Sequence, residues 1–418
     1  MAVPITHTRT AARNLLYTRA YFFASIGAGG FILPFLALFY QERGLSGSQI
    51  GLLVATAGIA GTLAAPIWGR RSDSSPHPRR LLQLALLGSG VCMLLLGLQT
   101  TFLWMAVFVA SDALVGGGLE PLSTAQALAV TNREKSGFGS IRLWGSLGWA
   151  IIAPISGWMI ERRGLYSAFV GYFIGMLVSA TILGLVRTET AAQSRTPKRE
   201  EEEANPTPEL SDRSQARQPT GKLLATLSRD RTMVGLALAL TILWLCGAGR
   251  LQFEAIYMKQ LGASETIIGL ASTIGALIEL PAMLLADRLV RRYGAGAVLQ
   301  CSLLLQAGGM SLVLIFPSVT AILGMRALSG IYYSLYLVAS IAYVVQGAPQ
   351  GRDSTVLALY MVTLRGLVGL VGAPLSGYLY DVLGAYWLYA VALGGTLLGW
   401  LTLRLTARPV TPGYATSF

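Results

Sequence analysis

Charged residues are scarce in this chain. Only 12% of its 418 residues are charged, about half the share of a soluble globular chain, whereas 53% are hydrophobic. The two histidines, His7 and His77, lie outside the long apolar segments, which excludes a catalytic histidine within those segments. The three cysteines lie inside apolar segments without metal-ligand spacing, so we expect them to have packing roles.

The sequence also lacks a visible Ser/His/Asp set, P-loop or cluster of metal ligands. We therefore expect neither an enzyme nor an ATP-driven pump, and no cofactor and no metal. The net charge of +12 raises the question of a nucleic-acid partner. Because the basic residues are spread over separate loops beside apolar segments, we expect no nucleic-acid binding.

Long apolar segments are abundant. Most have about 20 residues or more, enough to cross ~30 Å of hydrocarbon as a helix. The 48 glycines suit closely packed membrane helices. The pattern predicts an all-α integral membrane protein, embedded in the lipid bilayer as a monomer, with twelve transmembrane helices. The predicted spans are 17–40, 48–69, 80–99, 102–131, 138–160, 164–186, 232–258, 265–287, 294–316, 319–346, 354–380 and 385–406.

The loops on one side of these spans are much richer in arginine and lysine than those on the other side. Basic loops stay on the cytoplasmic side. The sequence therefore predicts a multi-pass protein of the inner (plasma) membrane with both termini in the cytoplasm.

Part of the sequence occurs twice. Residues 153–164 return as residues 373–384 at an offset of 220, reading A-P-I-S-G-W and A-P-L-S-G-Y, and each copy continues to an acid, Glu161 or Asp381. Weaker echoes relate 40–52 to 257–270, and Asp73 with its following arginine pair to Asp287 with its own. Two copies in the same order predict two parallel six-helix halves with a substrate path between them.

The repeat predicts three regions. Residues 1–190 and 221–418 form the two six-helix bundles. Residues 191–220, with mixed charges and four interspersed prolines from Pro197 to Pro219, form a cytoplasmic linker.

Two six-span halves, a charged central linker and an Asp–Arg loop after the second span resemble the major facilitator superfamily. The resemblance implies that this loop and its repeat latch the halves together in the outward-facing state. The first loop lacks the family's middle arginine, which is Ser74 here, and the second matches better. The gating-loop residues are Asp73, Arg79, Arg80, Asp287, Arg288, Arg291 and Arg292.

Residues 138–149, read as F-G-S-I-R-L-W-G-S-L-G-W, resemble the start of the fifth span in the branch of lactose permeases and of nucleoside and phenylpropionate symporters. In the permeases, an arginine at the place of Arg142 binds sugar together with a carboxylate on the fourth span. Thr124 stands at the place of that carboxylate, and Glu120 precedes Pro121 instead. The resemblance to the permeases therefore does not imply specificity for lactose in this protein.

Eight charged residues lie within or at the ends of predicted spans: Asp112, Glu120, Arg142, Arg250, Glu254, Glu279, Arg326 and Arg365. Charges in hydrocarbon are costly and generally face a cavity. The resemblance implies that helices three, six, nine and twelve face lipid, and none of the eight lies there. We expect these residues to bind substrate or couple protons.

Each charge also has a structural alternative. Glu279, near mid-depth, is expected to carry the coupling proton with Arg365 as its partner, or to form a static ion pair with it. Arg250 and Glu254, four residues apart, pair on one helix face or bind substrate. Arg142 either binds or gates together with Glu120, or extends to the membrane surface.

Aromatic residues on cavity helices complete the expected pocket. Trp144 is a candidate as an aromatic residue on a cavity helix. Tyr332 and Tyr336 are better candidates because they are not at span ends, where tyrosines anchor helices to the interface. The sequence thus predicts a proton-coupled symporter of a sugar, nucleoside or aromatic acid. The alternative is a proton-driven exporter of drugs or metabolites, and a third class is a non-transporting sensor or lipid-flipping protein.

Overall fold

The structure, a computed structural model, describes residues 5–134, 138–186, 226–349 and 351–406. The predicted linker 191–220 falls outside these residues. Within them the chain forms eleven helices long and apolar enough to cross a membrane, or twelve if the bent pair in residues 265–293 counts as one span. The twelve predicted spans each correspond to one of these segments, which confirms a multi-pass helical membrane protein.

The N-terminal half holds the first six spans. They are α1 (Ile5–Ile32), continued by η1 (Leu33–Phe35) and α2 (Leu36–Glu42); α3 (Gly47–Ser74); α4 (Pro78–Leu96); α5 (Phe102–Gly116), continued by α6 (Leu119–Glu134); α7 (Phe138–Arg163); and α8 (Tyr166–Leu185).

The C-terminal half holds the other six. They are α11 (Arg231–Gln260); α12 (Glu265–Tyr293); α13 (Ala295–Ile315); α14 (Val319–Gly347); α15 (Asp353–Ala358), continued by the π-helical η5 (Leu359–Leu364) and α16 (Arg365–Leu383); and α17 (Ala385–Thr406).

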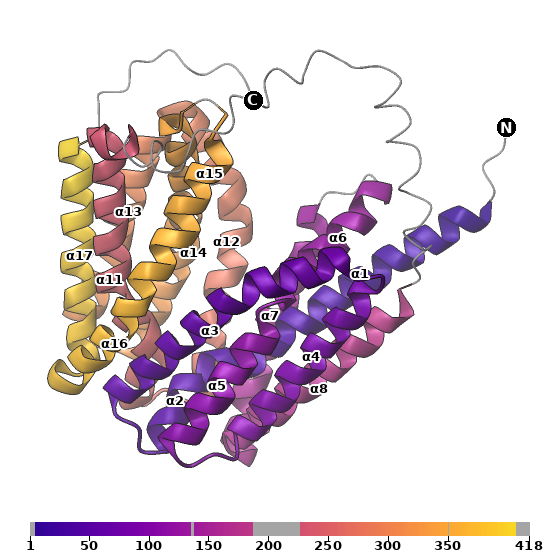
Figure 1. Cartoon of the computed structure of the whole chain (residues 1–418). Helices are drawn as coiled ribbons and strands as arrows, with labels where there is room; N and C mark the ends of the chain where they lie inside the picture. Colours follow the sequence, from indigo (N-terminus) through magenta and orange to yellow (C-terminus); the bar gives the residue numbers. More distant parts are fainter. Residues whose placement is uncertain (1–4, 135–137, 187–225, 350, 407–418) are drawn as a thin grey trace, which may run out of the picture.

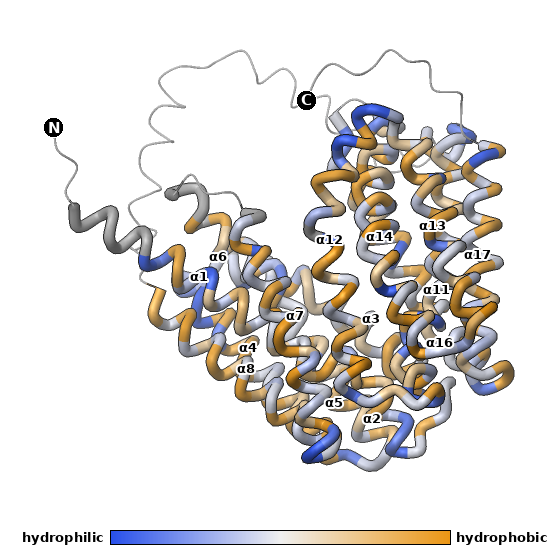
Figure 2. The backbone as a smooth tube through the Cα atoms, turned by 180° about the vertical axis from the view of Figure 1, so that it is seen from behind, coloured by the Kyte–Doolittle hydropathy of each residue, from blue (hydrophilic) through white to orange (hydrophobic). Residues whose placement is uncertain are grey.

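The two halves touch at one end and diverge at the other (Figure 1). The principal contacts between them join α3 to α16 and α7 to α12. We call the end where α8 finishes and α11 begins the linker end, and the end with the loops 43–46 and 261–264 the far end. The halves meet at the far end, so the space between them opens toward the linker end. Hydrophobic residues predominate along the helices (Figure 2).

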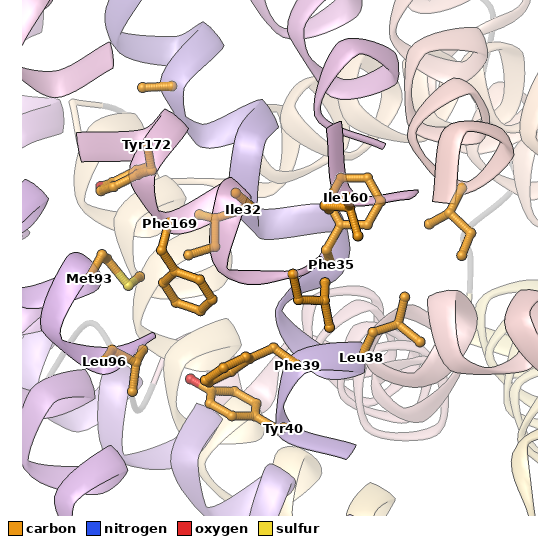
Figure 3. Packing of buried hydrophobic residues seen from close by; sticks show 14 of the residues in the cluster. Ile32, Phe35, Leu38, Phe39, Tyr40, Met93, Leu96, Ile160, Phe169 and Tyr172 are labelled. Atoms are coloured by element: carbon orange, nitrogen blue, oxygen red, sulfur yellow. The ribbon is translucent and has the colours of Figure 1, made fainter. Parts of the chain in front are cut away.

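Aromatic packing fixes the far end of the N-terminal half. Phe39 lies edge-on to Phe169 with ring centroids 4.6 Å apart, beside Met93 and Leu96 (Figure 3). All four side chains are buried. Dense packing of this kind resists displacement, so α2 is held against α4 and α8 at the far end.

Candidate transport pathway

The duplicated segment forms the closure at the far end. In its second copy, the Asp381 carboxylate accepts hydrogen bonds from the backbone N–H of Gly47, at 2.6 Å, and of Ser48, at 2.8 Å. It also accepts a 2.7 Å hydrogen bond from the Ser48 hydroxyl. The first residues of a helix have N–H groups without an intrahelical acceptor. Asp381 on α16 therefore caps α3 of the opposite half.

The first copy makes the matching contact in the other direction. Glu161, near the end of α7, accepts a 2.8 Å hydrogen bond from the backbone N–H of Thr266 at the start of α12. Each of the two acidic residues of the repeat thus caps one helix of the opposite half, Asp381 the start of α3 and Glu161 the start of α12. Both acids were recognisable in the sequence as part of the repeat, but the sequence did not indicate what they bind.

Glycines in the same segments allow the backbones to touch. A Cβ atom at position 377 would lie 2.1 Å from the carbonyl oxygen of Gly47, and one at position 157 would lie 2.2 Å from that of Glu265. No side chain fits at such distances, so both positions need glycine while the far end is closed.

The predicted gating loops make no contact between the halves within the described residues. Asp287 pairs with Arg291 one turn later on α12, and both are exposed. Arg79 donates to the Gln126 side chain and the Val186 backbone, both in its own half. Arg80, Arg288 and Arg292 are exposed, and the side chain of Asp73 lies outside the described part. The contacts given for the described side chains of these loops thus stay within one half, in keeping with the divergence at the linker end.

Glu279 lies where α12 bends by 42°, between Glu279 and Pro281. The bend follows from Pro281, which has no N–H to offer the preceding turn. The carboxyl group is half-buried, and Arg142 on α7 of the other half lies near enough to interact with it electrostatically. The prediction paired Glu279 with Arg365, but no ion pair joins these two among the described residues. The structure thus does not show the static ion pair, and the coupling role predicted for the two residues stays a prediction.

Arg365 instead belongs to an aromatic group in the C-terminal half. Its guanidinium lies 6.0 Å from the ring centroid of Trp244 on α11, and the Trp244 indole N–H donates a 3.0 Å hydrogen bond to the Tyr336 hydroxyl. Tyr333 packs against Tyr336. Arg365 follows the π-helical η5 directly. Trp244 was missed in the sequence because one aromatic residue in an apolar run gives no signal of its direction.

Three of the predicted charges form one buried cluster. Glu254 pairs with Arg250 at 3.1 Å and with Arg326 of α14, and the Tyr389 hydroxyl of α17 lies 3.3 Å from the same carboxylate. Arg250 and Glu254 are 5% and 3% exposed. The cluster thus ties α11, α14 and α17 together, which favours the structural alternative for the Arg250–Glu254 pair. Tyr332, also predicted for the pocket, is buried near Arg250.

The remaining candidates lie apart. Asp112 accepts a 2.6 Å hydrogen bond from Ser89, whose hydroxyl lies 2.8 Å from that of Tyr172, so its contacts are inside the N-terminal half. Glu120 and Arg142 are both exposed, and no hydrogen bond or ion pair joins them among the described residues. Trp144 is 38% exposed.

Two helical bundles that close on each other at one end, with ionisable side chains where they meet, define a membrane transport protein for small solutes. The chain belongs to the MFS_1 like family of the major facilitator superfamily, whose family model matches residues 15–391. This confirms the membership and the twelve-span fold that the sequence predicted.

Named relatives differ in how much of the chain they match. The maltose permease of Geobacillus stearothermophilus is 27% identical over 401 residues, which cover 95% of each protein. The multidrug resistance protein MdtG of Yersinia enterocolitica is 35% identical over 167 residues, which cover 38% of this chain and 39% of that protein. The crystal structure of the nucleoside transporter NupG superposes with a TM-score of 0.76 at 12% identity, covers 94% of this chain and 98% of its own, and shows the fold alone.

Proposed function

We propose that the protein imports a small organic solute of the sugar class together with protons. The similarity to a maltose permease along 95% of both chains supports the substrate class. The observation that carries the coupling is the position of Glu279, a half-buried carboxyl group at a helix bend and within electrostatic range of Arg142 on the other half.

The position of Glu279 suits proton coupling. An opposite charge nearby favours the ionised form of a carboxyl group, and desolvation favours the protonated form. Arg142 and Glu279 lie on different halves, so movement of one half against the other changes their separation. The carboxyl group therefore binds its proton in one state and releases it in the other, which links proton movement to the conformational change.

Arg365, Trp244 and Tyr336 are the proposed substrate-binding group. Aromatic faces stack on the apolar faces of sugar rings, and the arginine and tyrosine provide hydrogen bonds to hydroxyl groups. Trp244 lies on α11, Tyr336 on α14 and Arg365 at the start of α16, all in the C-terminal half.

The linker end is proposed to face the cytoplasm, because the basic loops lie at that end. The far end then faces outward, and the structure corresponds to an inward-facing state. Opening outward requires that Asp381 and Glu161 leave their helix starts, while the loops around Asp73 and Asp287 close the cytoplasmic side.

Drug export is the second candidate. Its support is the 35% identity to MdtG, which is higher than the identity to the permease but is confined to 38% of the chain. Both proposals share the fold and the proton carrier, and they differ in the direction of substrate movement.

Transport by the purified protein in liposomes distinguishes the two. We expect radiolabelled maltose to accumulate when an inward proton gradient is imposed, and a protonophore to abolish the accumulation. If maltose fails to accumulate while a cationic dye is extruded at the expense of the gradient, the export proposal replaces the import proposal.

A further inference from the structure

A groove opens on the outer side of the N-terminal half, between α4 and α8. Its volume is about 490 Å³, and it is lined by Arg80, Gln83, Leu84, Leu87, Leu177, Ala180 and Thr181. The helices α4 and α8 lie on the side of this half away from the C-terminal half (Figure 1). The groove is therefore separate from the transport pathway and faces the membrane.

Polarity changes along the groove as it does along a phospholipid. Arg80 lies at the linker end, in the first turn of α4. Leu87 lies seven residues further along the same helix, or about 10 Å deeper by the helical rise. Leu84 and Leu177 are 62% and 44% exposed, so the deeper part offers uncovered apolar surface.

The polar end of the groove offers two side chains, Arg80 and Gln83, that can bind a ligand. Arg80 is exposed, and it forms no ion pair with any carboxylate that the structure describes. The Gln83 amide N–H donates a 2.9 Å hydrogen bond to the Ala180 backbone, which fixes the amide and leaves its oxygen as an acceptor. A phosphate beside a hydroxyl-bearing headgroup would satisfy both side chains.

We propose that this groove binds an anionic glycerophospholipid of the leaflet at the linker end. Its phosphate pairs with Arg80, a headgroup hydroxyl donates to Gln83, and one acyl chain lies along Leu84, Leu87 and Leu177. The bound lipid lies in the groove that runs along the contact between α4 and α8.

Native mass spectrometry of the delipidated protein tests this site with phosphatidylglycerol and phosphatidylcholine of identical acyl chains. We expect the wild type to retain phosphatidylglycerol preferentially. Arg80→Gln should weaken that binding about fivefold, the effect of one basic residue at a membrane surface. Arg292→Gln is the matched control, because Arg292 lies at the linker end of the second half, in the last turn of α12, and is also exposed. It should leave lipid binding unchanged.

A second variant tests the acyl part of the site. Thr181 is exposed in the groove wall, so Thr181→Trp should fill the groove and displace phosphatidylglycerol without disturbing the core. Inorganic phosphate should not compete, since it lacks the chain. Equal binding of both lipids, full binding by Arg80→Gln or Thr181→Trp, or displacement by phosphate alone would each overturn the proposal.

Discussion

The carboxylate of Asp381 on the C-terminal half lies 2.6 Å from the backbone nitrogen of Gly47 on the N-terminal half, 334 residues away in the chain. This hydrogen bond joins the two halves at the end where they meet. Together with the contacts of Ser48, it makes the start of α3 the binding site for one side chain of the repeat. The far-end closure therefore combines these polar contacts with the packing of α3 against α16 and of α7 against α12.

Asp381→Asn should weaken this closure, because a neutral amide is a poorer acceptor at a helix start than a carboxylate. We expect the population open at the far end to rise about fivefold. Double electron–electron resonance between spin labels at Glu42 and Trp387, both exposed at that end, measures it after replacement of the native cysteines. Asp287→Asn, which alters an acid at the linker end, should not widen the same distance.

Gly377→Ala should open the far end by a steric route. The added methyl group would lie 2.1 Å from the Gly47 carbonyl oxygen, so the two backbones must separate. The same pair of spin labels should report a longer distance. Gly366→Ala is the control on the same helix, because a Cβ atom there meets nothing within 4 Å. A distance distribution unchanged by Gly377→Ala would show that the backbones do not touch at this position.

Glu254→Gln should destabilise the C-terminal half. The change keeps the size of the side chain but leaves Arg250 and Arg326 without their anionic partner in a buried site. Removal of one partner from a buried ion pair costs about 3–5 kcal/mol. Thermal unfolding in detergent should show a clearly lower Tm. Asp287→Ala, which breaks an exposed pair with Arg291, is expected to change stability by less than about 1 kcal/mol, and a similar loss in both variants would refute the distinction.

Trp244→Ala should weaken maltose binding about tenfold, because it removes both the aromatic face beside Arg365 and the hydrogen bond to Tyr336. Trp244→Phe keeps a ring and should lose less. Titration calorimetry of the purified protein measures both, with Trp387→Ala as a control at an exposed position. Equal affinity in the wild type and Trp244→Ala would remove this group from the substrate site.

The fold could be predicted from the sequence. The length and apolar composition of the segments predicted the membrane spans, and the repeat predicted the two halves. It was less informative about which side chains meet. Sequence position gives the depth of Glu279 and Arg365 in the membrane, and the two depths are similar. It does not give the direction in which each side chain points, and the bend at Pro281 and the π-helical turn before Arg365 both change that direction.

The far-end closure shows a second limit. Glu161 and Asp381 were visible as repeated acids, but their partners are backbone N–H groups, which no residue type reveals. The buried cluster around Glu254 could be predicted from the sequence only in part. The spacing of Arg250 and Glu254 predicted their pair, whereas Arg326 joins it only through the packing of α14 beside α11.

The most direct test of the account is the behaviour of Glu279→Gln in proteoliposomes with maltose as the substrate. If Glu279 carries the proton, the variant should lose accumulation driven by a proton gradient. It should keep exchange of external for internal maltose, because exchange does not require deprotonation in each cycle. Glu42→Gln, an exposed change at the far end, should keep both activities. Normal gradient-driven accumulation by Glu279→Gln would contradict the account and leave Asp112 as the next candidate for the coupling residue.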